Sequence, residues 1–417
     1  MKKLRSGYTT GACAAAAAKA ATLLLLSGLD QDQVVIPFPD GTRVSFKLCA
    51  CQWSDPAHTT ALAAVIKDAG DDPDVTNGAR IEAEVRFGRS CTVHGARDTG
   101  PSMACAPHDE MPAEQANDAS QRLRITIVGG KGVGTVTKPG LAVPVGEPAV
   151  NPVPEKMIRE AVAEAFSLST DCAETTLIVT ISIPDGEELA KKTLNHRLGI
   201  IGGLSILGTT GIVRPVSAEA WTATISASMD VARAAGVEAI VISTGRTSES
   251  AVQQRLQLPD EAYVMMGDYL HFSLDDARKH GFAAIHLAAM WAKVLKGAMR
   301  IPQTHVRHGA LEVENAIAFL ATLGTSPAVL NGLAGSNTAR EIYDRLIAMD
   351  CRESIRKVCC AARDYCQEVS GLPVTVYLVT AGATAGQGRP SVASAMDGAG
   401  ATSCRQIVEC VEGNLRQ

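Results

Sequence analysis

The stretch from Gly129 to Pro154 has a composition suited to binding, because it combines glycines, prolines and two lysines. Glycine lets a backbone approach a ligand closely, and proline fixes φ and removes a hydrogen-bond donor. A segment of this composition cannot form an ordinary helix. It follows the apolar run from Leu123 to Val128, so we expect a shaped loop that leaves a strand and ends where a helix begins.

The start of this loop, GGKGVGTVTK, could lie against a flat or anionic ligand. It contains Lys131 and Gly134 and ends at Lys138. The glycine spacing is neither GxGxxG followed by a helix nor GxxxxGK[ST], so a nucleotide-binding loop is only weakly supported. A rigid crossover that binds nothing is the alternative, and the sequence leaves both interpretations open.

A second candidate is Thr9-Thr10-Gly11, which precedes an alanine-rich helix expected from residue 12 to about residue 26. Threonine caps helices, and the free N–H groups and dipole at this end attract anions. Cys13 would lie in the first turn, where the pKa of a thiol is lowered. The alternative is a capped helix that only packs.

A second glycine-rich stretch contains GTTG, in which Thr209 and Thr210 offer hydroxyl and backbone donors. This motif echoes the TTG near the start of the chain. Arg197 and Arg214 lie on either side of it, and guanidinium groups bind carboxylates well. We expect a domain boundary next to Arg214.

The segment KDAGDDPDVTNG supplies carboxylates, of which Asp71 and Asp72 are adjacent. Such a group could provide a general base or ligands for a hard metal, although the spacing does not match an EF-hand. Solvated turn carboxylates are the alternative for most of them. The pattern from Thr59 to Gly70 predicts a helix that leads into this segment.

Beyond residue 215, apolar runs alternate with helical patterns. Buried runs separated by helices indicate a mainly parallel sheet in a three-layer α/β domain. Ligands bind at the carboxyl ends of the strands in such sheets. The residues expected at that edge are Gly245, Arg246, Thr247 and Asp268.

Composition limits the class of protein. A chain of 417 residues is expected to form two domains, and its formal net charge of -5 does not favour a nucleic-acid partner. Lys19 interrupts the apolar N-terminal stretch, and no run is long enough to span a membrane. We therefore expect a cytoplasmic protein without membrane or nucleic-acid partners. The cysteine spacings match no zinc pattern, so no metal site is expected.

Six stretches together resemble one family, the cobalt-precorrin-5B C1-methyltransferases (CbiD) of the oxygen-independent route to cobalamin. They lie in family order between residue 4 and about residue 309: LRSGYTTGACAAAAAKAA, KDAGDDPDVTNG, GGKGVGTVTKPGLAVPVGEPAVNPVP, TLNHRLGIIGGLSILGTTGIVRP, STGRTSE and QTHVRHG. The resemblance implies S-adenosylmethionine as methyl donor and cobalt-precorrin-5B as acceptor, methylated at C1 to give cobalt-precorrin-6A. Cobalt enters only as part of the substrate, the substrates are small molecules, and a homo-oligomer stays open.

The resemblance also implies a mixed α/β fold. We expect an α/β sandwich domain over residues 1–214 and a Rossmann-like, three-layer domain with a mainly parallel sheet over residues 215–417. Two departures stand out. Asn77 lies where the family is expected often to have His, which argues against an essential acid or base there. The loop of residues 96–120 looks longer than the usual connection.

Methyl transfer from a sulfonium to an electron-rich ring carbon needs mainly positioning and desolvation. Under the resemblance, Asp71 or Asp72 takes up a proton or faces the sulfonium, and His305 is the best candidate among the histidines. The acceptor carries carboxylates, so we expect it to meet the glycine-rich loop, the helix start and nearby cations. These residues are Thr9, Thr10, Gly11, Lys131, Gly134, Lys138, Arg197 and Arg214.

Two places are open for the donor: the strand ends that carry Gly245 to Thr247 and Asp268, or the loop of Thr209 and Thr210. Two other functions also stay open. One is a non-catalytic corrinoid-binding protein that uses the same loops to hold the macrocycle. The other is a nucleotide-dependent phosphotransferase with GGKGVG as its phosphate cradle.

Overall fold

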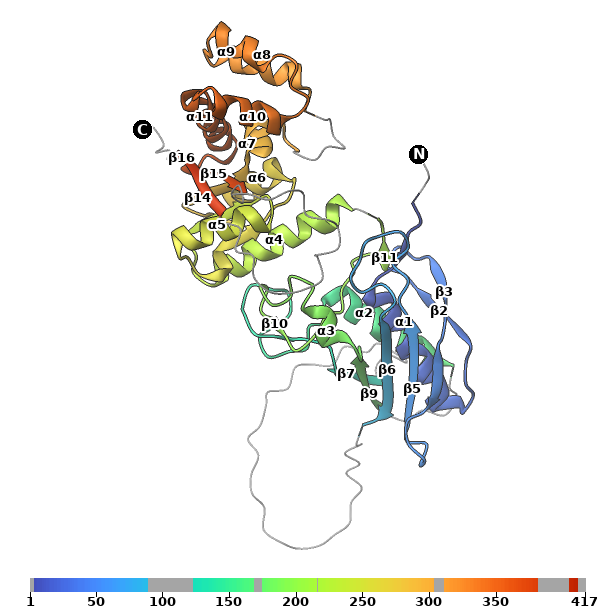
Figure 1. Ribbon diagram of the computed structural model, residues 1–417. Coiled ribbons are helices and arrows are strands. Elements are labelled where there is room, and N and C mark those ends of the chain that lie inside the picture. The colour runs from blue at the N-terminus through green and yellow to red at the C-terminus, as the bar shows by residue number, and fades with distance from the viewer. Residues whose placement is uncertain are drawn as a thin grey trace, which may run out of the picture. The chain divides into compact units, whose positions relative to one another are not determined.

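A computed structural model describes residues 4–88, 123–168, 175–215, 217–303, 311–381 and 405–411. The chain divides into two compact units, whose elements are labelled in Figure 1. The first unit comprises Met1–Thr137 and Ala142–Ser217. The second comprises Ala218–Gln417 together with the short segment Lys138–Leu141, which the sequence did not lead us to expect there.

The first unit is built on a five-stranded sheet in which only one pair of strands is parallel. The strands, in spatial order, are β4 (Ala50–Trp53), β5 (Thr60–Ile66), β6 (Arg80–Phe87), β9 (Thr175–Ser182) and β7 (Leu123–Gly129). β7 and β9 are parallel, and the remaining pairs are antiparallel. β2 (Gln33–Pro37) and β3 (Arg43–Lys47) form a separate antiparallel hairpin.

Two helices, α1 (Thr10–Ser27) and α2 (Pro152–Ser167), pack against each other, and α1 also packs on β5 and β6 (Figure 1). The alanines of α1 are all buried, because a side chain of one methyl group lets the helix approach its neighbours closely. By length and composition α1 could cross a membrane, and it is the one helix in the described chain that could. However, 83% of it is buried inside the protein.

The helix predicted from Thr59 to Gly70 is wrong, because this segment forms β5. Ala61 and Ala63 are buried on one face, as the two-residue period of a strand requires. β4 and β6 satisfy the backbone groups on both sides. Tertiary pairing has therefore overridden the helix preference of alanine.

Short pairings shape the glycine-rich loops of the first unit. β1 (Gly7–Tyr8) pairs with β11 (Ile212–Val213), and β8 (Thr135–Val136) pairs with β10 (Ile200–Ile201). A short helix, α3 (Gly186–Ala190), precedes β10. Segments far apart in the sequence are thereby brought together.

The second unit has a five-stranded sheet with the strand order β13-β12-β14-β15-β16. Its strands are β12 (Ala239–Ser243), β13 (Tyr263–Met265), β14 (Ala284–Met290), β15 (Val374–Ala381) and β16 (Arg405–Val411). The first four are parallel, and β16 runs antiparallel to β15. Ile240, Val241 and Ile242 are all buried, as expected for a parallel strand covered on both faces.

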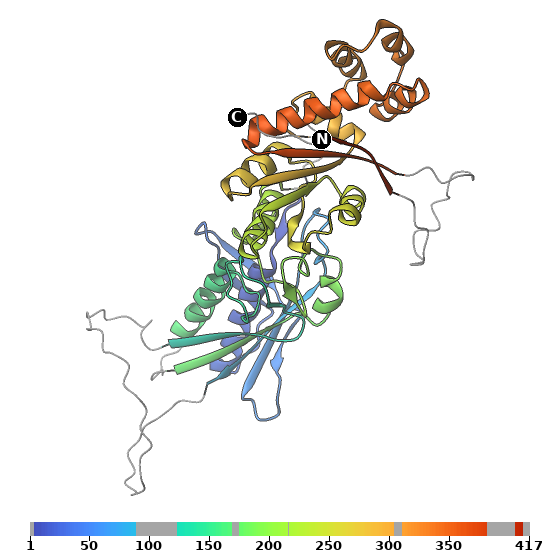
Figure 2. The same cartoon turned by 90° about the vertical axis from the view of Figure 1, so that its left-hand side faces the viewer.

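The second unit contains eight described α-helices. They are α4 (Ala218–Ala234), α5 (Arg246–Leu256), α6 (Leu270–Lys279), α7 (Trp291–Ala298), α8 (Val313–Thr322), α9 (Pro327–Leu333), α10 (Ala339–Ala348) and α11 (Arg352–Ser370). Of these, α4, α5, α7 and α11 contact strands of the sheet, whereas α8 contacts α9, which in turn contacts α10. The long helix α11 lies along β15 and β16 (Figure 2). Strand order reverses between β12 and β14, so right-handed connections place α5 and α6 on opposite faces. Such a reversal leaves a crevice at the carboxyl ends of the two central strands.

Candidate functional site

The carboxyl end of β12 opens directly into the first turn of α5. Gly245 is the N-cap residue, no side chain caps the helix, and a Cβ added at Gly245 would meet nothing within 4 Å. The first N–H groups of a helix have no partner within it. This end of α5 therefore presents backbone donors and open space.

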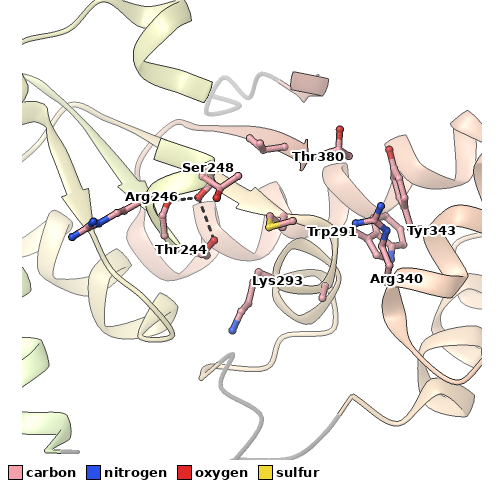
Figure 3. A pocket seen from close by; sticks show the side chains of 13 residues that line it. Thr244, Arg246, Ser248, Trp291, Lys293, Arg340, Tyr343 and Thr380 are labelled. Carbon is pink, nitrogen blue, oxygen red and sulfur yellow. Dashed lines mark hydrogen bonds between the residues drawn. The ribbon is translucent and has the colours of Figure 1, made fainter. Parts of the chain in front are cut away.

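A cavity of about 370 Å³ lies at this edge of the sheet (Figure 3). It is lined from β12 and α5, from the end of β14 and the start of α7, from α10, and from the end of β15. The lining residues are Thr244, Gly245, Arg246, Thr247, Ser248, Met290, Trp291, Ala292, Lys293, Arg340, Tyr343, Val379 and Thr380. The predicted Gly245, Arg246 and Thr247 thus line one cavity together with residues from distant parts of the chain.

Hydroxyl groups dominate the polar part of the cavity. The Thr244 and Ser248 oxygens are 3.4 Å apart, and Ser248 Oγ donates to the Gly245 carbonyl at 2.9 Å. Figure 3 shows the Arg246 side chain extending away from this hydroxyl pair. Trp291 and Tyr343 form an aromatic contact with ring centroids 5.5 Å apart. The cavity therefore has hydroxyls on one side and aromatic rings on another.

The fourth predicted residue of this edge, Asp268, follows β13 and is ion-paired with Lys293. Lys293 itself lines the cavity, so Asp268 lies next to it through this pair. Burial lowers the pKa of the neighbouring Lys296, and the charge of Lys293 lowers it further. The charged groups at this edge are therefore electrostatically coupled.

Sequence reasoning missed the cavity residues on α7, α10 and β15. Lys293 and Thr380 could have been found, because Lys293 lies in the first turn after β14 and Thr380 lies near the carboxyl end of β15. Arg340 and Tyr343 could not, because only the packing of α10 brings them there. Glu249 was also missed: it is 1% exposed and accepts from Ser243 Oγ at 3.2 Å, which ties α5 to the end of β12.

In the first unit, the start of α1 is packed against protein. Thr9 Oγ1 accepts from the Ala12 N–H at 3.2 Å, and the Gly11 N–H donates to the Leu207 carbonyl at 3.1 Å. A Cβ at Gly11 would lie 2.7 Å from Pro154 Cγ. These donors already have partners, so the open anion site expected at this helix end does not match the observed hydrogen bonds.

The two TTG motifs nevertheless meet. The Thr9 N–H donates to the Gly211 carbonyl at 3.0 Å, and Thr10 Oγ1 accepts from the Leu207 N–H at 2.9 Å. Thr209 and Thr210 lie exposed in the loop between these contacts. The fold thus joins the helix start to the second glycine-rich stretch.

The acidic segment is joined to the N-terminus. The Arg5 N–H donates to an Asp71 carboxylate oxygen at 2.7 Å, and the Asp71 N–H donates to the Arg5 carbonyl at 2.9 Å. The Arg5 guanidinium donates to both oxygens of Asp68, and this bond holds the pKa of Asp68 below its usual range. Asp72 is half-buried beside them. Asn77 accepts from the Ala69 N–H at 2.9 Å, which is a structural role.

The buried Lys67 holds the acidic segment in place through an ion pair with Asp74. Its side chain is 1% exposed, and Nζ lies 2.6 Å from an Asp74 oxygen. Burial would raise the pKa of Asp74, but hydrogen bonds from Lys67 and Thr76 and the charge of Lys67 outweigh it and lower this pKa. The loop that carries Asp71 and Asp72 is therefore a fixed element.

The pKa of the Cys13 thiol is raised, whereas its place in the first turn of a helix led us to expect a lowered pKa. Burial raises its pKa to about 12, because an apolar environment disfavours the thiolate. Its position in the first turn of α1 does not offset this desolvation. Cys13 is therefore a packing residue and not a reactive thiol.

The glycine-rich loop packs on the protein itself. The Gly134 N–H donates to the Leu204 carbonyl at 2.9 Å, and a Cβ there would lie 2.4 Å from Ile200 Cγ2. Gly132 has φ +73, and a Cβ would lie 2.0 Å from the Ile183 carbonyl oxygen. Backbone and side chains of the protein occupy the positions where these two glycines would carry a Cβ, so both glycines are needed for close packing within the first unit.

The predicted cations have different surroundings. Lys131 and Arg214 are exposed, and Arg197 is half-buried. Lys138 belongs to the second unit and pairs with Glu261 at 2.7 Å, which lowers the pKa of Glu261. Lys138 is therefore engaged with a carboxylate of the second unit, whereas Lys131 belongs to the first.

Three expectations lie outside the described residues: His305, the loop of residues 96–120 and most of the stretch QTHVRHG. Within the described part of the chain, no group of three or more His, Cys, Asp or Glu side chains could hold a metal ion.

Comparisons with known proteins agree with one another. The CbiD family model matches residues 1–215, and the model described as CbiD, C-terminal domain, matches residues 303–385. A curated protein of Desulfotalea psychrophila named cobalt-precorrin-5B C(1)-methyltransferase is 53% identical over 91% of this chain and 96% of its own length. The protein of the same name from Geobacter metallireducens is 48% identical over 82% of this chain and 87% of its own length.

A solved structure, the cobalamin biosynthesis protein (cbiD) from Archaeoglobus fulgidus, is 25% identical and covers 84% of both chains with a TM-score of 0.34. The family model spans more than half of this chain, and the curated relatives match at well over 30% identity across most of it. The chain therefore belongs to the CbiD family.

Proposed function

We propose that this chain is a methyltransferase that moves a methyl group from S-adenosylmethionine to C1 of cobalt-precorrin-5B, a step of cobalamin biosynthesis. The observation that carries the proposal is the 53% identity, over 91% of this chain, to a protein named for that reaction. The cavity at the carboxyl edge of the second unit supports it, because its position suits a nucleotide-like ligand.

The donor site we infer is this cavity, in a second unit that we interpret as Rossmann-like. Its volume of about 370 Å³ is within the range for small-molecule pockets. The open space at Gly245 lets a ligand approach the protein backbone closely. The hydroxyls of Thr244 and Ser248 can donate hydrogen bonds to that ligand. Asp268 can accept from ribose hydroxyls, since a carboxylate after the second strand has this role in dinucleotide-binding sheets. The residues present therefore fit the donor.

The acceptor site we infer lies in the first unit. There the Gly11 N–H at the α1 start donates to the Leu207 carbonyl, just before the GTTG loop, and the Asn151 N–H near the end of the glycine-rich loop donates to the Ile206 carbonyl. The macrocycle carries carboxylates, and the exposed Lys131 and Arg214 can bind them. Arg197 is a third candidate.

S-adenosylmethionine would supply the methyl group as a sulfonium, whose carbon–sulfur electron pair stays on sulfur while the ring carbon forms the new bond. The chain then has to orient the two partners and exclude water. The described residues around the cavity contain no thiol nucleophile, which agrees with direct transfer. Asp71 and Asp72 are the carboxylates we assign to proton uptake, because Arg5 and the buried Lys67 hold their loop in place.

Calorimetry of the purified chain tests the donor site. We expect S-adenosylmethionine to bind and ATP not to bind. Asp268→Asn should weaken donor binding by about 1.5–3 kcal/mol, the cost of losing a hydrogen bond to a charged group. Asp275→Asn is the matched control, because Asp275 pairs only with neighbours on α6 and lies away from the cavity lining.

ATP binding without S-adenosylmethionine binding would favour the phosphotransferase instead. A corrinoid that binds but never gains a methyl group would favour the carrier. We also infer small-molecule partners and a cytoplasmic location, which follow from the proposed reaction.

A further inference from the structure

Trp221, on α4, is an exposed aromatic side chain held in a fixed position. It is 43% exposed, and its indole N–H donates to the Met266 carbonyl at 3.1 Å. An exposed tryptophan leaves a large apolar surface in water, and the hydrogen bond prevents the ring from turning to cover it. By contrast Trp291, which lines the cavity, is 4% exposed.

The backbone next to Trp221 is shaped to receive the ring. Gly267 has φ +58, and a Cβ there would lie 3.0 Å from Trp221 Cζ2. Only glycine combines this conformation with so close an approach. The next residue is Asp268, whose partner Lys293 lines the cavity. The indole, the carboxylate and the cavity therefore follow one another along the carboxyl edge of the sheet.

We propose that Trp221 is the stacking platform for the adenine base of the donor, beside the ribose-binding carboxylate of Asp268. This inference rests on the proposed function. Stacking of a base on an aromatic ring is worth about 1–3 kcal/mol and needs a flat, accessible face. The exposed indole of Trp221 packs on Gly267, which directly precedes Asp268, so that face lies next to the acceptor that a ribose needs.

Two variants separate stacking from support of the loop. Trp221→Leu and Trp221→Phe both lose the hydrogen bond to Met266, but only Trp221→Phe keeps an aromatic face. Calorimetry with S-adenosylhomocysteine should show about tenfold weaker binding for Trp221→Leu, the size expected for one lost stack. Trp221→Phe should keep most of the affinity. Equal losses in both variants would assign Trp221 to loop support and overturn the platform.

Fluorescence gives an independent readout. An adenine stacked on Trp221 should quench its emission, so S-adenosylhomocysteine should quench wild-type protein and methionine alone should not. Trp221→Phe should abolish most of the quenching. Trp53→Phe is the matched control, because Trp53 belongs to the first unit and stacks on His58.

The inference and the proposed function fail in different ways. Methyl transfer to the acceptor tests the proposed function alone. An active protein whose affinity for S-adenosylhomocysteine is unchanged in Trp221→Leu would overturn only the platform. A folded protein that transfers no methyl group overturns the proposed function itself.

Discussion

At the scale of single residues, the most constrained charge in the first unit is Lys67. An ammonium group is costly to desolvate, and the Lys67 side chain is buried directly after β5 with its Nζ 2.6 Å from an Asp74 carboxylate oxygen. We expect Lys67→Met to lower the free energy of unfolding by roughly 3 kcal/mol, because it leaves a partly buried carboxylate unpaired. Urea denaturation measures this change.

Lys67→Met with Asp74→Leu is the compensating variant, because it removes both charges and should recover much of the stability. A single Lys67→Met variant as stable as wild type would contradict the anchoring role. The exposed pair of Lys191 and Glu188 is the control, since Lys191→Met should change stability little.

The same pair predicts a pH dependence. The pKa of Asp74 is lowered in the folded protein, so its stabilising contribution is present above the unfolded value of about 3.9 and is lost as pH falls through the folded pKa. Asp74→Asn should therefore be less stable than wild type near neutral pH, and the difference should shrink in acid. Unfolding curves from neutral pH down to acid check this. A difference that grows as pH falls would show that the sign is wrong.

At the scale of elements, the glycine-rich loop is held by contacts that a Cβ would disrupt. Gly134→Ala should lower the free energy of unfolding by about 1–3 kcal/mol, because the methyl group would overlap Ile200 and Gly203. Thermal unfolding of Gly134→Ala and Thr135→Ala compares a buried position with its exposed neighbour in the chain. If Gly134→Ala is as stable as wild type, the loop is looser than its packing indicates.

Sequence patterns predicted the elements whose local preference agrees with the surrounding packing. The alanine-rich helix expected from residue 12 to about residue 26 is α1, and the apolar run from Leu123 to Val128 lies in β7. β5 was mistaken for a helix, since its alanines favour helices locally and only pairing with β4 and β6 makes a strand. β16 was missed, because its role as an edge strand depends on β15.

The candidate site was predictable in part for the same reason. Gly245 and Asp268 follow strands of a recognisable parallel sheet, so the rule about carboxyl ends found them. Tyr343 and Trp221 come from helices whose position no local pattern specifies. The free donors expected at the α1 start were already bonded to Leu207, a contact nearly two hundred residues away along the chain.

At the scale of the whole molecule, the family assignment and the geometry of each unit support the same reaction. The family model covers residues 1–215, where the acidic segment and glycine-rich loops converge. The cavity, with Asp268 and Lys293 beside it, belongs to the second unit. Under the proposed function, we assign the donor to the second unit and the acceptor to the first.

The most direct test of this account is methyl transfer itself. Purified protein is incubated without oxygen with cobalt-precorrin-5B and S-adenosylmethionine that carries a deuterated methyl group, and the corrinoid is analysed by mass spectrometry. We predict that the corrinoid gains one deuterated methyl group, located at C1, and that S-adenosylhomocysteine forms in equal amount. Folded protein that binds both compounds and leaves the corrinoid mass unchanged would contradict the account.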